Sequence, residues 1–215
     1  MAVNDTSPSQ RTEVLKASPR MFDSDFLDKF SRVHPAVPPI IFVPVIVALL
    51  VVALGRSSVL GVLGLIAAGY VFWTLTEYWL HRVVFHFEPE AGIGARLHWM
   101  MHGVHHDHPN DPKRLVMPPG ASIPLALLFT GVFVLVVGSP TWMPFEAGFL
   151  GGYLFYDSLH YYVHHHRPKS RWGKRLRELH MRHHFQDDTA GFGVSAPWWD
   201  HVFGTAAPRK APQRK

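Results

Sequence analysis

The sequence contains no cysteine among its 215 residues. Disulfides, thiolate zinc sites and iron–sulfur clusters are therefore excluded. A metal ion in this protein must be held by histidine, carboxylate, backbone or water ligands. The sequence also shows no cleavable signal peptide at its N-terminus, so its apolar segments are interpreted as permanent membrane anchors.

The charge balance is basic, with 21 Lys and Arg against 16 Asp and Glu. A basic excess is compatible with nucleic-acid binding, but 47% of the residues are hydrophobic and they gather in long apolar runs. This pattern is typical of a membrane protein, in which basic loops face anionic lipid. We therefore expect a lipid bilayer, and no nucleic acid, as a partner.

Four apolar runs predict an all-α integral membrane protein with four transmembrane helices in two hairpins. The first two runs, residues 35–55 and 57–76, contain no charge and have about the 20 residues needed to span a bilayer. The third run covers residues 123–137. The fourth, residues 142–159, is weaker because it contains Glu146 and Asp157, so a tilted or re-entrant helix is an alternative there.

The chain divides into four predicted segments. Residues 1–19 are polar and are expected to form a flexible tail. Residues 20–34 carry apolar side chains at helical spacing, which predicts an amphipathic interfacial helix or, as an alternative, an ordinary solvated surface helix. Residues 35–205 form the membrane domain, and residues 206–215 form a basic tail.

The distribution of Lys and Arg predicts the orientation. Five precede the first run, four lie in the central segment between the hairpins and eleven follow the fourth run, whereas the two hairpin loops hold only Arg56. Positive residues favour the cytoplasmic side. Both termini and the central segment are thus predicted to be cytoplasmic, which makes the protein multi-pass and puts a helical cap on that side.

Sixteen histidines are far more than a core requires, and ten of them form four motifs. These are HRVVFH (His81, His86), HGVHH (His102, His105, His106), HYYVH (His160, His164) and HMRHH (His180, His183, His184). Residues three and four apart share a helix face, so each of the last three motifs is predicted to aim its imidazoles at one point. His81 and His86 are five apart, so we expect them to bind different metals or to straddle a helix end.

Ten histidines are too many ligands for one ion, whereas two ions with about five histidines each use them all. Imidazole suits zinc, copper, iron and nickel. No histidine of the ten has a glutamate three residues before it, which disfavours a carboxylate-bridged site. A non-enzymatic metal binder or transporter is the alternative from another class. It predicts histidines deep within the apolar runs, but all ten lie at or beyond the run ends.

The order of these motifs around two hairpins resembles the fatty acid hydroxylase superfamily, which includes sterol desaturases. From Pro19 to Thr205, stretches such as RLVMPP, GGYLFYDSLHYYVH and GFGVSAPWWDHVFGT are similar to the fatty acid 2-hydroxylases. The resemblance implies an O₂-dependent hydroxylation at C2 of a free or lipid-linked fatty acyl chain. It also implies two iron ions held by the ten histidines, with zinc able to occupy the sites in purified protein. A desaturase, a sterol oxidase or a head-group hydroxylase is the alternative within the superfamily.

Many members carry an N-terminal haem-binding domain, which the residues before the first run are too few to form. A separate electron donor, a ferredoxin or a small cytochrome, is therefore expected. Further side chains flank the motifs and are candidates for substrate contact, with aromatic anchoring at the interface or a loop-structural role as alternatives. These are His98, which is alternatively a partner of a metal ligand, Arg114, which would bind a head group, and Asp157, Tyr161, Tyr162, Trp199 and Asp200.

Overall fold

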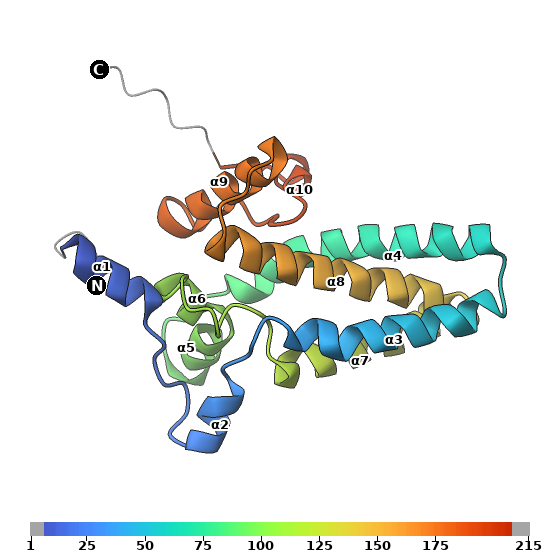
Figure 1. The fold of residues 1–215 in the computed structure, drawn as a ribbon, viewed down its shortest axis with the longest axis horizontal. Helices are drawn as coiled ribbons and strands as arrows, with labels where there is room; N and C mark the ends of the chain where they lie inside the picture. The colour runs from blue at the N-terminus through green and yellow to red at the C-terminus, as the bar shows by residue number, and fades with distance from the viewer. Residues whose placement is uncertain (1–6, 208–215) are drawn as a thin grey trace.

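The computed structural model describes residues 7–207, and in that range the secondary structure is entirely helical. Four long helices run side by side: α3 (Val37–Leu54), α4 (Val59–Trp79), α7 (Pro119–Val136) and α8 (Trp142–His165). All the shorter helices gather at one end of this bundle (Figure 1). They are α1 (Pro8–Lys16), α2 (Asp25–Phe30), η2 (Leu80–Phe85), α5 (Gly92–His98), η3 (Trp99–Gly103), α6 (Val104–Asp107), α9 (Arg171–Phe185) and α10 (Trp198–Val202).

Three of the four predicted spans form helices that are long and apolar enough to cross a membrane: α3, α4 with its extension to Phe85, and α7. Most of their side chains point outward, as lipid-facing helices require. The fourth helix, α8, does not reach that hydropathy although it is a continuous helix of 24 residues. The reason is its position: α8 packs against α3, α4 and α7, and more than half of its residues are buried in protein.

Two glycines allow α8 to approach α4 closely. A Cβ on Gly69 of α4 would lie 1.9 Å from the carbonyl oxygen of Phe145, and one on Gly148 of α8 would lie 2.1 Å from that of Ile66. Any larger side chain would therefore push the two helices apart. This close packing places the C-terminal ends of α4 and α8, where two of the histidine motifs begin, next to each other (Figure 1).

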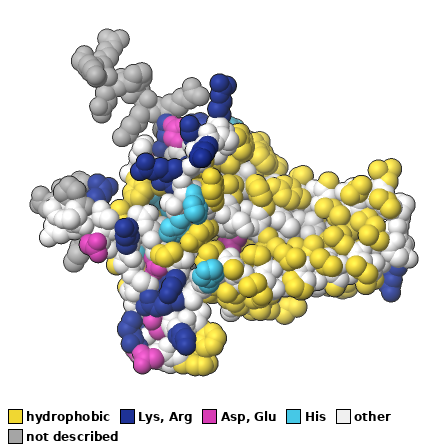
Figure 2. Space-filling model, in the orientation of Figure 1, with side chains coloured by type: hydrophobic (Ala, Val, Ile, Leu, Met, Phe, Trp, Pro, Cys, Tyr) yellow, Lys and Arg dark blue, Asp and Glu magenta, His cyan; other side chains and the backbone are white. Residues whose placement is uncertain are grey.

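The two ends of the molecule differ sharply in charge. Hydrophobic side chains cover the four-helix part, whereas Lys, Arg, Asp and Glu concentrate on the short helices (Figure 2). The loop between α3 and α4, which contains Arg56, lies at the opposite end. All four histidine motifs lie at the charged end, together with the first and last described residues (Figure 1).

The N-terminal segment is more ordered than we predicted. Residues 8–16 of the predicted tail form α1, whose N-terminus is closed by a capping box between Ser7 and Gln10. His108 Nδ1 lies 2.6 Å from the Val14 carbonyl, and the Asn110 amide donates to the Leu15 carbonyl at 2.9 Å. These contacts hold α1 against the residues that follow α6. The predicted interfacial helix is only six residues long, and the C-terminal tail from residue 208 onward lies outside the described residues.

Candidate metal centre

The ten motif histidines form two clusters of five. The outer cluster contains His81, His86, His102, His106 and His183. The inner cluster contains His105, His160, His164, His180 and His184. Within each cluster the five candidate ligand atoms all lie within 4.8 Å of one another. The clusters adjoin, because the rings of His106 and His184 stack with their centroids 4.3 Å apart.

In both clusters the Nε2 atoms converge. In the outer cluster, His81 Nε2 lies 3.2 Å and His106 Nε2 lies 3.0 Å from His102 Nε2. In the inner cluster, His164 Nε2 lies 2.8 Å and His184 Nε2 lies 3.1 Å from His180 Nε2. The Nε2 atoms of His105 and His160 are buried without a hydrogen-bond partner among the described residues. Imidazole nitrogens that converge in this way could hold a metal ion in each cluster.

The structure corrects our interpretation of the five-residue spacing in HRVVFH. His81 and His86 lie in the same cluster, with ring centroids 5.0 Å apart. The expectation that they bind different metals assumed an α-helix, on which residues five apart lie about 140° apart, but residues 80–85 form a π-helix. The His86 amide donates to the His81 carbonyl at 3.2 Å, which is the i→i+5 bond of a π-helix. His86 ends this helix, so the expectation that the pair straddles a helix end was correct.

The structure also corrects the prediction that each HxxHH motif serves one point. The pairs four residues apart stay together: His102 with His106 in the outer cluster, and His180 with His184 in the inner cluster. The middle histidine of each motif, His105 or His183, belongs to the other cluster. Adjacent residues point about 100° apart on a helix. Each HxxHH motif therefore contributes to both clusters.

Burial keeps these imidazoles neutral. It lowers the pKa of His102, His105 and His180 well below the usual 6.5, and the neighbouring imidazoles lower it further. The same causes lower the pKa of His86 to about 3 and that of His106 to about 2. Neutral imidazole is the form that binds metals, so the ligands need not lose a proton at neutral pH.

A cavity of about 370 Å³ opens beside the outer cluster. His86, His102 and His106 form part of its wall, together with Glu88 and Asp188. His86 and His106 are correspondingly half-buried. The inner cluster does not line this cavity, and four of its five histidines are buried. The outer cluster is therefore the one that solutes reach from the charged end.

His98 is the one substrate-contact candidate that lines this cavity. Its ring is half-buried, and its Nε2 lies 2.6 Å from the carbonyl oxygen of Phe85, the last residue of the π-helix. His98 belongs to neither cluster. Its contact with the backbone beside His86 makes it a neighbour of the outer cluster.

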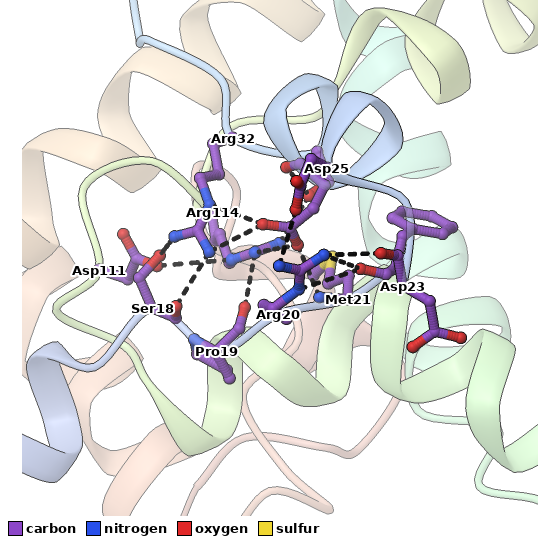
Figure 3. Close-up of polar contacts among 12 residues, drawn as sticks. Ser18, Pro19, Arg20, Met21, Asp23, Asp25, Arg32, Asp111 and Arg114 are labelled. Atoms are coloured by element: carbon purple, nitrogen blue, oxygen red, sulfur yellow. Dashed lines mark hydrogen bonds and ion pairs between the residues drawn. The ribbon is translucent and has the colours of Figure 1, made fainter.

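Arg114, predicted to bind a head group, is engaged elsewhere. Its guanidinium donates to the Pro19 carbonyl at 2.6 Å, to Ser31 Oγ at 2.9 Å and to Asp28 Oδ1 at 3.2 Å (Figure 3). Asp28 also accepts from the Met21 amide at 2.8 Å, and that bond, with the two arginines beside it, holds the pKa of the carboxyl well below its usual range. Arg114 thus joins the N-terminal segment to the loop between α6 and α7.

The other candidates for substrate contact also have structural partners. Asp157 is buried and accepts from the Met117 amide, and the Trp199 indole donates to Thr74 Oγ1 at 3.1 Å. The rings of Tyr161 and Tyr162 pack on His165 and His166. Asp200 is buried and accepts backbone amides.

Sequence reasoning did not recognise the contact between residues 190–192 and the outer cluster. His81 Nδ1 lies 2.7 Å from the Phe192 carbonyl oxygen, and His183 Nδ1 lies 2.9 Å from that of Ala190. Backbone carbonyls leave no pattern in the sequence. The only available signal was the similarity of GFGVSAPWWDHVFGT to other proteins.

Comparisons with known proteins agree with this arrangement. Residues 66–205 match the fatty acid hydroxylase family model. The dihydroceramide fatty acyl 2-hydroxylase FAH2 of Arabidopsis thaliana is 37% identical over 92% of this chain and 84% of its own length. The human fatty acid 2-hydroxylase is 34% identical over 89% of this chain and 57% of its own length.

A solved structure of scs7p, in which only the hydroxylase domain is visible, has the same fold. The two sequences are 36% identical and the TM-score is 0.81. The match covers 89% of this chain and 73% of the scs7p chain. The match of the family model covers most of the chain and includes all ten histidines of the two clusters. The chain therefore belongs to the fatty acid hydroxylase family.

Proposed function

We propose that this protein is an O₂-dependent membrane hydroxylase that places a hydroxyl group at C2 of a fatty acyl chain. The observation that carries the proposal is the pair of adjoining five-histidine clusters in a chain whose relatives, at 34–37% identity, are fatty acyl 2-hydroxylases. Two adjoining metal sites suit a reaction that must deliver several electrons to O₂.

The donor set fits two iron ions. The proposed ligands are the Nε2 atoms of the ten clustered histidines, five for each ion. Imidazole binds ferrous iron well, although it also binds zinc, so zinc in a purified sample would not contradict the assignment. Iron in these positions would supply the O₂ chemistry that no protein side chain provides.

The protein's own residues supply position and exclusion of water. The π-helix aligns His81 with His86, and the buried inner histidines keep solvent from that half of the centre. The lipid-facing helices α3, α4 and α7 bring the centre to the membrane surface, where an acyl carbonyl can lie at the charged end with its chain in the bilayer. Site selection is then set by which carbon reaches the metals.

The orientation and the electron donor are part of the proposal. The basic residues at the charged end support a cytoplasmic location for both termini and the centre (Figure 2). The cavity beside His86 and His106 supports delivery of electrons from that side by a separate donor, a ferredoxin or a small cytochrome.

The test is lipid analysis of cells that express the chain under ¹⁸O₂, with mass spectrometry of the hydrolysed acyl chains. We expect 2-hydroxy fatty acids that carry one ¹⁸O, and none in cells that express the His102→Ala/His180→Ala variant at equal level. A new double bond, or a hydroxyl elsewhere on the lipid, would replace this proposal with another reaction of the family.

A further inference from the structure

The segment between α9 and α10 supports the outer cluster through its backbone. The contacts of the Phe192 carbonyl with His81 and of the Ala190 carbonyl with His183 are 2.7 and 2.9 Å long. A carbonyl oxygen only accepts, so the Nδ1 atom of each ring must carry the proton. The Nε2 atom of each ring is then left as a free lone pair, which faces the other outer-cluster histidines.

Asp200 holds this segment in place. Its side chain is buried, with 3% exposure, and lies in α10. The Phe192 amide donates to Oδ1 at 2.8 Å, and the Gly193 amide donates to Oδ2 at 2.9 Å. Thr205 Oγ1 donates to Oδ1 at 2.8 Å. Both carboxylate oxygens are therefore used to fix the backbone that carries the Phe192 carbonyl.

The backbone of residues 191–193, which Asp200 contacts, is tightly constrained. A Cβ on Gly193 would lie 2.5 Å from the Ala196 carbonyl oxygen. Gly191 has a φ of +81°, which other residues rarely adopt, and its amide donates to the Thr205 carbonyl at 2.9 Å. The segment is a tight loop held at residues 191–193 by Asp200 and Thr205 and further along, at Ser195, by Glu77 of α4.

The inner cluster lacks such support. The Nδ1 atoms of His164, His180 and His184 are buried and have no hydrogen-bond partner in the described part of the chain. Partners of this kind fix the tautomer of a metal-binding histidine and make it a stronger ligand. Two outer histidines have them, and these three inner ones do not.

We propose that Asp200 is a positioning residue for the outer metal: through the Phe192 backbone it fixes the ring and tautomer of His81, and through the same loop those of His183. This inference rests on the proposed metal centre. An amide at position 200 would place an NH₂ group where an oxygen now accepts a backbone N–H, so the loop would have to move. The outer site would weaken, whereas no hydrogen bond joins this loop to an inner-cluster histidine among the described residues.

The experiment measures Co²⁺ binding by the purified full chain in detergent, from the visible absorption of the bound ion. Two backgrounds isolate the sites: His160→Ala/His164→Ala leaves the outer site, and His86→Ala/His106→Ala leaves the inner site. We expect Asp200→Asn to weaken the outer site by about 10- to 100-fold, as is typical when a ligand's partner is lost, and to leave the inner site unchanged. The spectrum of the outer Co²⁺ should also shift.

The matched control is Asp28→Asn. Asp28 is also a carboxylate that accepts a backbone amide, and it pairs with Arg114 away from the loop. It should change neither affinity. Equal weakening of both sites by Asp200→Asn would mean a general structural role and would overturn the proposal, as would no weakening of the outer site. If the wild-type chain binds no Co²⁺ at either cluster, it is the proposed metal centre that fails. Asp200→Glu, which keeps both oxygens, should recover part of the outer affinity.

Discussion

The two clusters have the same ligands and different surroundings. Each offers five ligand nitrogens within 4.8 Å of one another, yet the outer one borders the cavity and the inner one does not. The π-helix and the loop carbonyls of Ala190 and Phe192 shape the outer cluster, whereas α8 and α9 alone supply four of the five inner histidines. A repeated motif has thus been placed in two environments, one that borders the cavity and one that does not. Ions bound at the two proposed sites would differ in their access to solvent.

The largest expected effect comes from removal of one ligand in either cluster. His102→Ala in the outer cluster and His180→Ala in the inner one should each lower the yield of hydroxylated lipid by more than about 100-fold, since losing a ligand costs more than losing its hydrogen-bond partner. Product yield and iron content per chain are the measurements. Full activity in either variant would show that one cluster is dispensable and would remove the dimetal proposal.

Metal removal should distinguish the two sites by the rate at which each loses its ion. When the zinc-loaded protein is treated with a chelator at neutral pH, we expect two phases of about equal amplitude, because only the outer site opens on the cavity. The released zinc is measured with a colorimetric indicator. The His86→Ala/His106→Ala variant should lose the fast phase, and the His160→Ala/His164→Ala variant should lose the slow one. A single phase in the wild-type chain would mean that the two sites are equally accessible.

The pH dependence of stability should reveal the lowered histidine pKa values that the two clusters share. In the metal-free protein the pKa of His105 is well below 6.5 and that of His106 is about 2, because each ring is desolvated and lies beside other imidazoles. The unfolded chain binds protons near pH 6.5, so the stability is complete above pH 6.5 and falls as the pH is lowered towards 5. His105→Ala and His106→Ala should each reduce this slope by at most about 1.4 kcal/mol per pH unit. Melting temperatures between pH 7.5 and 5 test this. A temperature that stays constant over that range would contradict it.

Much of this arrangement could be predicted from the sequence. Apolar runs identified the long helices, and the i,i+4 spacing of His160 and His164 placed both in one cluster. The π-helix could not be foreseen, because its i→i+5 bond to His86 depends on packing and has no local signature. The weak hydropathy of α8 was visible in the sequence, but the packing against α3, α4 and α7 that buries its polar residues was not. The hydrogen-bond partners of the Arg114 guanidinium were equally hidden, since Pro19, Asp28 and Ser31 lie more than 80 residues away in the chain.

The smallest expected effect concerns His98, which lines the cavity together with three outer-cluster histidines. Its bond to the Phe85 carbonyl supports the end of the π-helix next to His86. Loss of one such hydrogen bond costs about 1 kcal/mol, so His98→Ala should weaken the outer site by about 5- to 10-fold and leave the inner site unchanged. Co²⁺ affinity in the two isolating backgrounds provides the measurement.

The size and kind of the His98 effect decide among its possible roles. A loss beyond about 100-fold would make His98 a sixth outer ligand, because that is the range expected when a ligand itself is removed. An unchanged affinity with a raised KM for the acyl substrate would make it the substrate contact that its place on the cavity wall allows. The intermediate result is the one that the Phe85 contact predicts, since a ring that holds the backbone beside a ligand acts on the metal only through that ligand.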